Sequence, residues 1–487
     1  MTAAALPADD RRFFGHPRGL ALLFVAEMWE RFSYYGMRAL LVLYLIKALG
    51  WSDARAYELY GTYTGLVWLT PMIGGWLADR YLGTHRALLI GGAVIAAGHF
   101  TLALPSLTAF YAGLVLVVLG TGLFKPNAST MVGQLYAPGD GRRDAGYTIF
   151  YMGINTGAFV APLICSWLGE RIGWHWGFGA AGVGMAIGLV MYASAKRRYL
   201  GTIGDVPAGR VVAAAPGVAA QAGSGIRGWH ALVGGSIGAA LALASGGANL
   251  VAVLTGTVIG AAMAAALLSS HGEERRRMIA LCLVVFFVIF FWMAFEQAGS
   301  SMNVFADRHT ARTLGGFTIP AGWFQSVQPL TLILFAPLVA VAWTALARRN
   351  AEPSTPMKMA WGLMLVGLSF VVMAVAGRAA DAGRQVSPWW LVGAYSLQSF
   401  GELAVSPVGL SYVSKLAPAR LAALAMGLFF LSNAAASKAA GMLAAQTEAI
   451  GSLGGFFLLL VATSAGAGLV LMLLVPMLKR MTSSAAA

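Results

Sequence analysis

The feature that most restricts how this chain can fold is a series of apolar segments, each about 20 residues or longer, that recurs from one end to the other. Each segment is long enough to cross the hydrocarbon core of a bilayer. Only 11% of the 487 residues are charged, whereas soluble domains carry about 25% charged residues. Since backbone groups in lipid must be hydrogen-bonded within their own segment, the spans are expected to be helices. The sequence therefore predicts an all-α polytopic membrane protein.

The loops between these segments carry Lys and Arg unevenly. With the N-terminus inside, basic residues on the inner side outnumber those on the outer side by about three to one, the bias that places both termini in the cytoplasm. The net charge of +14 therefore reflects topology and not a nucleic-acid footprint. The 14 expected transmembrane helices cover residues 20–46, 57–79, 87–104, 107–133, 145–168, 175–194, 229–246, 249–269, 277–303, 321–347, 358–377, 388–414, 420–446 and 452–478.

A change of composition near the middle divides the chain. Residues 199–228 are rich in Gly, Ala and Pro and are expected to form a cytoplasmic linker. Residues 229–269 lack Asp, Glu, Lys and Arg, so we expect a two-helix hairpin at the periphery of the bundle. Removing it leaves six spans on each side. The predicted domains are a six-helix bundle (1–198), the linker and extra hairpin (199–275), and a second six-helix bundle (276–487).

A cluster of three ionisable residues, followed by Arg38, interrupts the first span. Each such side chain at bilayer depth is unfavourable by roughly 2.5–3.5 kcal/mol on insertion scales, so it usually faces a polar interior. Glu27, Glu30 and Arg31 share one helix face by their spacing, and Tyr34 continues that face. One interpretation is an ion pair that only joins helices. However, two carboxylates compete for one nearby Arg, and the surplus carboxylate predicts protonation chemistry.

Further ionisable residues lie deep in later spans. Lys125 stands in mid-span beside Pro126, too far from either helix end to reach water easily. Glu296 and Glu402 lie within apolar surroundings in the second half of the chain. The first half thus offers two carboxylates and two cations, Arg31 and Lys125, and the second half offers carboxylates without a matching deep cation. A ligand between them is predicted to be a zwitterion with well-separated charged ends.

The loop that closes the second span carries a recognisable pattern. The segment from Gly74 to Arg86 resembles the signature loop of the major facilitator superfamily, with Asp79 and Arg80 placed to pair with helix ends. An ordinary charged loop with positive-inside anchors is the alternative. The predicted role of this loop is conformational rather than ligand binding.

Four separated motifs carry a more specific resemblance. They are E-x-x-E-R from Glu27 to Arg31, the run Lys125-Pro126-Asn127, F-Y-x-x-I-N-x-G from Phe150 to Gly157, and G-E-L-x-x-S-P from Gly401 to Pro407. Over essentially its whole length the chain resembles the proton-dependent oligopeptide transporter (POT/PTR) family. The resemblance implies a major facilitator fold of two six-helix bundles plus the hairpin of the bacterial members. It also implies import of di- and tripeptides together with protons by alternating access.

The resemblance assigns expected roles to individual residues. Arg31 and Lys125 are expected to meet the peptide carboxylate, and Glu402 with Asn155 the amino end. Proton coupling is expected to involve Glu27, Glu30, Arg31 and Glu296, while Lys125 and Glu402 also change partners with conformation. Side chains expected to line the site are Tyr34, Tyr35, Tyr63 and Trp292.

Two site positions depart from the family pattern. Gln328 stands where the family usually has Asn, and Phe429 stands where a Trp is expected, so both are expected to affect substrate preference. Lys438, deep in a late span, has no role that the motifs supply. An interaction that joins two helices is the preferred interpretation.

The expected partners are a small peptide and the lipid bilayer, with the proton as coupling ion and no other cofactor, metal or nucleic acid. The expected protein is a monomer in the bacterial inner membrane. A related carrier for nitrate or peptidomimetic drugs is the main alternative, although nitrate has no amino end for Glu402. A membrane enzyme is disfavoured because no nucleophile–base pair or metal-ligand cluster is apparent. A sensor would need a signalling domain, which the short tail after Lys479 does not provide.

Overall fold

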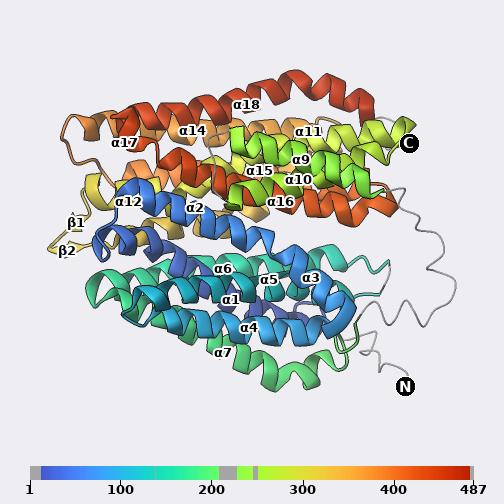
Figure 1. Cartoon of the computed structure of the whole chain (residues 1–487), viewed down its shortest axis with the longest axis horizontal. Helices are drawn as coiled ribbons and strands as arrows, with labels where there is room; N and C mark the ends of the chain where they lie inside the picture. The colour runs from blue at the N-terminus through green and yellow to red at the C-terminus, as the bar shows by residue number, and fades with distance from the viewer. Residues whose placement is uncertain (1–11, 138, 208–226, 245–249, 483–487) are drawn as a thin grey trace. The chain divides into compact units, whose positions relative to one another are not determined.

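The computed structural model describes residues 12–137, 139–207, 227–244 and 250–482, and within these ranges it is built of helices with one small hairpin (Figure 1). Each of the predicted spans coincides with one helix or with consecutive helices, which confirms the all-α polytopic fold. Most of the expected linker, residues 208–226, lies outside the described ranges. So do the first eleven residues and the ends of two predicted spans at 245–249.

Two compact units can be distinguished among the described residues, and neither coincides with a half of the sequence. The first unit comprises Met1–Tyr44, Thr70–Ala219 and Pro320–Ile333. The second unit comprises Leu45–Leu69, Ala220–Ile319 and Leu334–Ala487. The division into 1–198, 199–275 and 276–487 stays a prediction, because packing in one conformation does not show which segments move together.

In the first unit, α4 packs against α5 and α7, and α6 packs against α7 and the short helix η4. The elements are α1 (Arg18–Lys47, ending within the second unit), α3 (Pro71–Leu77), the π-helical turn η1 (Ala78–Leu82), α4 (Thr84–Leu102), α5 (Leu107–Gln134), α6 (Arg143–Arg171), α7 (Trp174–Leu200) and the 3₁₀-helix η4 (Ala321–Ser326), which leads into α13 (Val327–Arg348).

In the second unit, α14 packs against α15 and α18, and α16 packs against α2 and α11. The elements are α2 (Asp53–Leu69), α9 (Gly228–Ala244), α10 (Leu250–Leu268), α11 (Gly272–Phe295), η3 (Glu296–Gly299), α12 (Ser301–His309), β1 (Thr313–Leu314), β2 (Phe317–Thr318), the remainder of α13, α14 (Thr355–Asp381), α15 (Trp389–Leu416), η5 (Ala419–Leu421), α16 (Ala422–Ala444), α17 (Thr447–Ile450) and α18 (Leu453–Thr482).

The predicted extra hairpin is the pair α9 and α10, which lie side by side (Figure 1). Gly234 and Gly238 of α9 face Gly256 and Gly260 of α10 so closely that a Cβ atom on any of them would collide with the opposite backbone. Small residues that allow such close approach are a common basis of helix pairing in membranes. This explains how a segment without charged residues still forms a defined hairpin.

Two predicted spans are interrupted. The second span breaks between α2 and α3, because Pro71 has no N–H and cannot continue the hydrogen-bonding pattern of α2. The span at 277–303 changes at Glu296 from α11 to the tighter helix η3. There the side chain of Gln297 donates a hydrogen bond to the carbonyl of Ala440 in α16, at 3.1 Å. The second interruption places a backbone irregularity at the buried polar side chains of Glu296 and Gln297.

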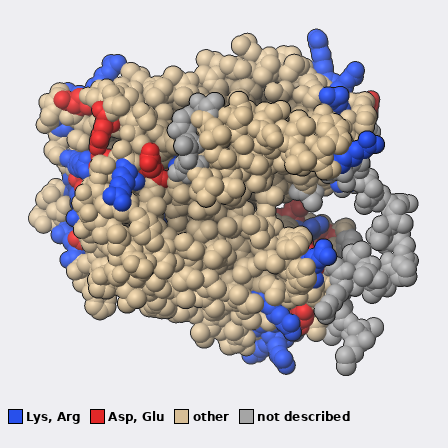
Figure 2. Space-filling view, in the orientation of Figure 1, with Lys and Arg blue, Asp and Glu red and all other residues tan. Residues whose placement is uncertain are grey.

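Lys, Arg, Asp and Glu side chains on the visible face gather toward the helix ends, and other residues cover the middle of the helices (Figure 2). By length and composition, nine helices or consecutive helices in the described part of the chain could each cross a membrane. The helix α1 is not among them, since it carries the buried residues Glu27, Glu30 and Arg31. This distribution fits a protein whose helices are surrounded by lipid.

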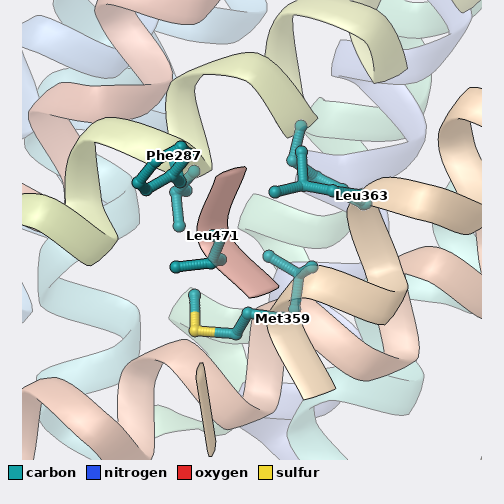
Figure 3. A pocket seen from close by; sticks show the side chains of 7 residues that line it. Phe287, Met359, Leu363 and Leu471 are labelled. Atoms are coloured by element: carbon teal, nitrogen blue, oxygen red, sulfur yellow. The ribbon is translucent and has the colours of Figure 1, made fainter. Parts of the chain in front are cut away.

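A narrow apolar gap lies among helices α11, α14, α15 and α18 (Figure 3). Phe287, Met359, Leu363 and Leu471 point into it, and none of its lining residues is ionisable. A gap lined only by hydrocarbon and a thioether offers no partner for a charged ligand. The candidate site therefore has to be built from the buried polar residues elsewhere.

Candidate functional site

The centre of the candidate site in the first unit is the guanidinium of Arg31. It forms a two-pronged ion pair with Glu30, in which Nη2 donates to Oε1 at 2.7 Å and Nε donates to Oε2. Its Nε also lies 3.3 Å from Oε1 of Glu27, four residues earlier on α1. All three side chains are at most 3% exposed. The predicted shared face of α1 is therefore present, with one cation between two carboxylates.

Glu27 is the less satisfied of the two carboxylates. Its second oxygen, Oε2, is buried and has no hydrogen-bond partner among the residues that the structure describes. Lys125 of α5 interacts with Glu27 electrostatically. An unpaired buried carboxylate oxygen is unfavourable, and a proton on the group would reduce the charge that has to be buried. The surplus carboxylate expected from the sequence is thus Glu27.

Aromatic rings extend this cluster along α1. The guanidinium carbon of Arg31 lies 5.2 Å from the centre of the Tyr34 ring, within the range of cation–π attraction. The rings of Tyr34 and Tyr35 meet edge to face at 5.1 Å. Arg38 lies in turn 5.6 Å from the Tyr35 ring. The expected site residues of α1 therefore form one continuous group.

The position of Arg31 is fixed by close packing of α6 on α1. Gly157 ends the motif that begins at Phe150, and a Cβ atom at this position would lie 3.1 Å from Cβ of Arg31 and 3.0 Å from the backbone nitrogen of Phe32. Gly153, one turn earlier, approaches the carbonyl of Phe24 in the same way. The two glycines bring the α6 backbone against α1. Asn155 lies between them and is buried.

Lys125 is placed by a second close approach, between α3 and α5. Gly122 packs against Gly74, where neither position has room for a Cβ atom. Pro126 follows Lys125 inside α5, and Asn127 donates from Nδ2 to the carbonyl of Leu123 at 2.7 Å. Lys125 is partly buried. The Lys-Pro-Asn motif thus holds a cation beside a proline, which has no N–H to donate within α5.

The second unit carries buried carboxylates. Glu296, the first residue of η3, accepts a hydrogen bond at 3.2 Å from the hydroxyl of Tyr60 in α2. Tyr63, one turn further along α2, is buried, and Trp292 meets Phe291 and Phe295 edge to face in α11. Glu402 of α15 is 8% exposed.

The two departures from the family pattern occupy different surroundings. Gln328 is buried near the start of α13, in the part of this helix that belongs to the first unit. Two residues earlier, the hydroxyl of Ser326 donates a hydrogen bond to the carbonyl of Phe159 in α6, at 2.8 Å. Phe429 is buried in α16, and its ring lies against Gly409 of α15, two turns beyond Glu402.

The predicted site residues are divided between the two units. The first unit contains Glu27, Glu30, Arg31, Tyr34, Tyr35, Lys125, Asn155 and Gln328. The second contains Tyr63, Trp292, Glu296, Glu402 and Phe429. Asp79 and Arg80 lie exposed in η1, away from the α1 cluster in sequence and environment.

Two polar contacts were not predicted from the sequence. Tyr60 was missed as the partner of Glu296, although it lies one turn before Tyr63 on the same face of α2. Glu170, near the end of α6, was also missed: it accepts hydrogen bonds from the backbone N–H groups of Ala321 (2.9 Å) and Gly322 (3.2 Å). No motif marks Glu170, and only the packing of η4 beside α6 gives it a partner.

The chain has buried ion pairs inside membrane-spanning helices, and its helices form two groups. Together these features are typical of a polytopic carrier of the major facilitator type. Residues 85–457 match the family model described as the POT family. A chain of Bacillus subtilis called an uncharacterized transporter is 41% identical, with 97% of this chain and 96% of the relative covered. A Yersinia enterocolitica peptide transporter is 37% identical over 92% of this chain and 91% of its own length.

A solved structure supports the same assignment. The crystal structure of a peptide transporter POT in complex with sulfate superposes with a TM-score of 0.83, at 38% identity and with 98% of each chain covered. The chain described here belongs to the POT family.

Proposed function

We propose that this chain is a proton-coupled symporter that imports di- and tripeptides across the bacterial inner membrane by alternating access. The observation that carries the proposal is Arg31, held between two buried carboxylates of which Glu27 keeps one oxygen without a partner in the described structure. Relatives at 36% and 37% identity are named a di-/tripeptide transporter and a peptide transporter. This supports a peptide as the ligand with which the proton is coupled.

In the proposed cycle, a proton on Glu27 or Glu30 weakens the hold of that carboxylate on Arg31. The guanidinium is then free to bind the carboxylate of the peptide, assisted by Lys125. Glu402 binds the amino end together with Asn155. Exchange of ion pairs within the protein for ion pairs to the ligand supplies the difference in affinity that a conformational change requires.

Glu296 gives the second carboxylate of the proposed proton path. It accepts a hydrogen bond from Tyr60, so its charge state affects how firmly α2 is held to η3. Protonation makes a carboxylate a weaker acceptor. A proton on Glu296 therefore favours release of α2, which couples the proton to a movement of a helix.

The test is uptake of a labelled dipeptide into proteoliposomes with an inward proton gradient. The expected result is accumulation above the external concentration, and its loss when a protonophore collapses the gradient. Equal uptake with and without the gradient would contradict coupling to protons. An excess of unlabelled dipeptide and tripeptide is expected to compete, whereas single amino acids are not.

A second ligand class is favoured by one comparison. A structure of a peptide transporter POT in complex with alafosfalin aligns at 38% identity with a TM-score of 0.82. In the same proteoliposomes, alafosfalin is expected to compete with the dipeptide. Nitrate is expected not to compete, because it has no amino end for Glu402. Competition by nitrate would favour the alternative of an anion carrier.

A further inference from the structure

Lys438 is a buried cation that the proposed mechanism does not use. It lies on α16, is 4% exposed, and its Nζ donates a hydrogen bond to the hydroxyl of Thr62 in α2 at 2.9 Å. The side chain thus crosses from one helix to another within the second unit. It therefore joins two helices and does not extend toward a helix end.

The two helices meet in a contact that leaves little room for side chains. We call this contact the α2–α16 seam and define it by Gly61 and Gly65 of α2 and by Ala434, Ser437 and Gly441 of α16. A Cβ atom on Gly61 would lie 2.8 Å from Cα of Gly441 and 2.9 Å from the carbonyl of Ser437. Gly65 approaches the carbonyl of Ala434 in the same way, at 3.2 Å. Backbone packing therefore holds the seam together.

Lys438 sits at the edge of this seam, with its Cβ atom 3.7 Å from the position of a Cβ on Gly65. An ammonium has three donors, and among the described residues Thr62 is the one that accepts a hydrogen bond from it. Glu58, one turn before Thr62 on α2, interacts with it electrostatically but is exposed. A buried cation with a single neutral acceptor is poorly compensated for its lost hydration. Backbone packing stabilises the closed seam, and the charge of Lys438 opposes it.

The seam joins parts of the chain that are far apart in sequence. Residues 45–69 belong to the first six spans of the sequence, yet they pack in the second unit together with α16. In the alternating access of the proposed function, the first six spans move relative to the last six, and this movement opens the seam. Its stability therefore sets how readily α2 separates from α16.

We propose that Lys438 is a positioning residue for transport, which keeps the α2–α16 seam only marginally stable so that it can open in each cycle. The proposal rests on the alternating access of the proposed function. Replacing the ammonium by an apolar side chain removes the opposing charge and stabilises the closed seam. Removing the Thr62 hydroxyl leaves the ammonium buried without its acceptor and destabilises the closed seam. The two changes thus act in opposite directions, although each removes the same hydrogen bond.

The experiment measures the distance between spin labels at Arg55→Cys on α2 and Ala449→Cys on α17, two exposed positions next to the seam. The native residues Cys165 and Cys282 are buried and stay unlabelled. In Lys438→Met the ratio of short to long distances is expected to rise at least about threefold. In Thr62→Val it is expected to fall by a similar factor, and Lys438→Arg is expected to stay close to the unsubstituted protein.

Peptide uptake gives the second measurement. Lys438→Met is expected to lower the maximal rate several-fold with little change in KM, because opening of the seam becomes slower. Lys415→Met, at an exposed position of α15, is the matched control and is expected to change neither the distances nor the rate. A purely structural role would lower the amount of folded protein and leave the distance ratio of the remainder unchanged.

A shift of Lys438→Met and Thr62→Val in the same direction would overturn the proposal, and so would the absence of a shift in both. If Lys438→Met does not fold, the Thr62→Val variant alone tests the proposal. A distance ratio in Thr62→Val equal to that of the unsubstituted protein would contradict a destabilising buried cation at the seam. The distances are measured without peptide or gradient. Failure of the unsubstituted protein to accumulate peptide would therefore contradict the proposed function without affecting the distance result.

Discussion

Among single side chains, the two carboxylates near Arg31 differ in how many of their oxygens have a partner. This difference indicates different roles for Glu27 and Glu30. Glu30 engages the guanidinium with both oxygens, whereas Glu27 uses one and leaves Oε2 without a partner in the described structure. The better paired group positions Arg31. The less satisfied group is the better candidate to take up a proton.

We therefore expect Glu27→Gln to separate proton coupling from peptide binding. The amide keeps the shape but cannot change its charge, so gradient-driven uptake should fall roughly tenfold or more. Exchange of labelled for unlabelled peptide without a gradient should be retained. Glu273→Gln, at an exposed position of α11, is the matched control. Gradient-driven uptake at the normal rate in Glu27→Gln would remove this residue from the coupling role.

His16 lies before α1, in a tight turn in which Phe13 and His16 exchange backbone hydrogen bonds. Its Nδ1 is 2.9 Å from the hydroxyl of Tyr136. Burial and the nearby Arg142 lower the pKa of His16 below its usual value. The folded turn disfavours the protonated imidazole. The contribution of neutral His16 to the stability of the turn is therefore fully present above about pH 6.5, and it is lost as the pH falls through the lowered pKa.

Hydrogen exchange of the peptide that covers this turn tests the prediction. After correction for intrinsic rates, protection should decrease as the pH falls below about 6.5. The variant His16→Asn should show protection that does not change over this range. The same pH dependence in both proteins would show that His16 is not the group responsible.

The sequence predicted the α1 cluster but not the partners on other helices. Spacing along one helix is enough to place Glu27 and Arg31 on one face. The contacts of Tyr60 with Glu296 and of Lys438 with Thr62 depend on how α2 crosses η3 and α16. Such a crossing is set by tertiary packing, for which no local pattern exists.

For whole helices, the spans were predictable because each needs a long apolar segment, and the interruptions were harder to predict. At Pro71 the second span stops as α2 and begins again as α3, although its apolar composition continues. The change to η3 at Glu296 had no local signal. It occurs beside the hydrogen bond from Gln297 to the carbonyl of Ala440, a contact that only the folded protein supplies.

The contact between α1 and α6 leads to a prediction about stability. In Gly157→Ala the new Cβ atom would lie 2.2 Å from the carbonyl oxygen of Met28 and 3.0 Å from the backbone nitrogen of Phe32, so α6 has to move away from α1. We expect a loss of stability of about 1–3 kcal/mol, typical of overpacking, and reduced peptide uptake. Thermal unfolding in detergent measures the first effect. Gly466→Ala is the control, because nothing lies within 4 Å of its new Cβ, and its melting temperature should not fall.

For the entire chain, the six-plus-six plan follows from counting spans, but the compact units do not. Residues 45–69 pack with the second unit and residues 320–333 with the first. A count of helices cannot show this, because it depends on which segments are in contact in one conformation. The glycines of the α2–α16 seam and the contacts of Glu170 with η4 are the local causes.

The distribution of Lys and Arg predicts cytoplasmic termini, and single cysteines test this orientation in intact cells. Ser52→Cys lies between α1 and α2, and Arg349→Cys follows α13; both positions are exposed. The positive-inside rule places the first outside and the second inside. A membrane-impermeant maleimide should label Ser52→Cys in intact cells and Arg349→Cys only after permeabilisation. The buried native cysteines give a low background. The reverse pattern would invert the topology, and the predicted side from which peptide and proton enter would change with it.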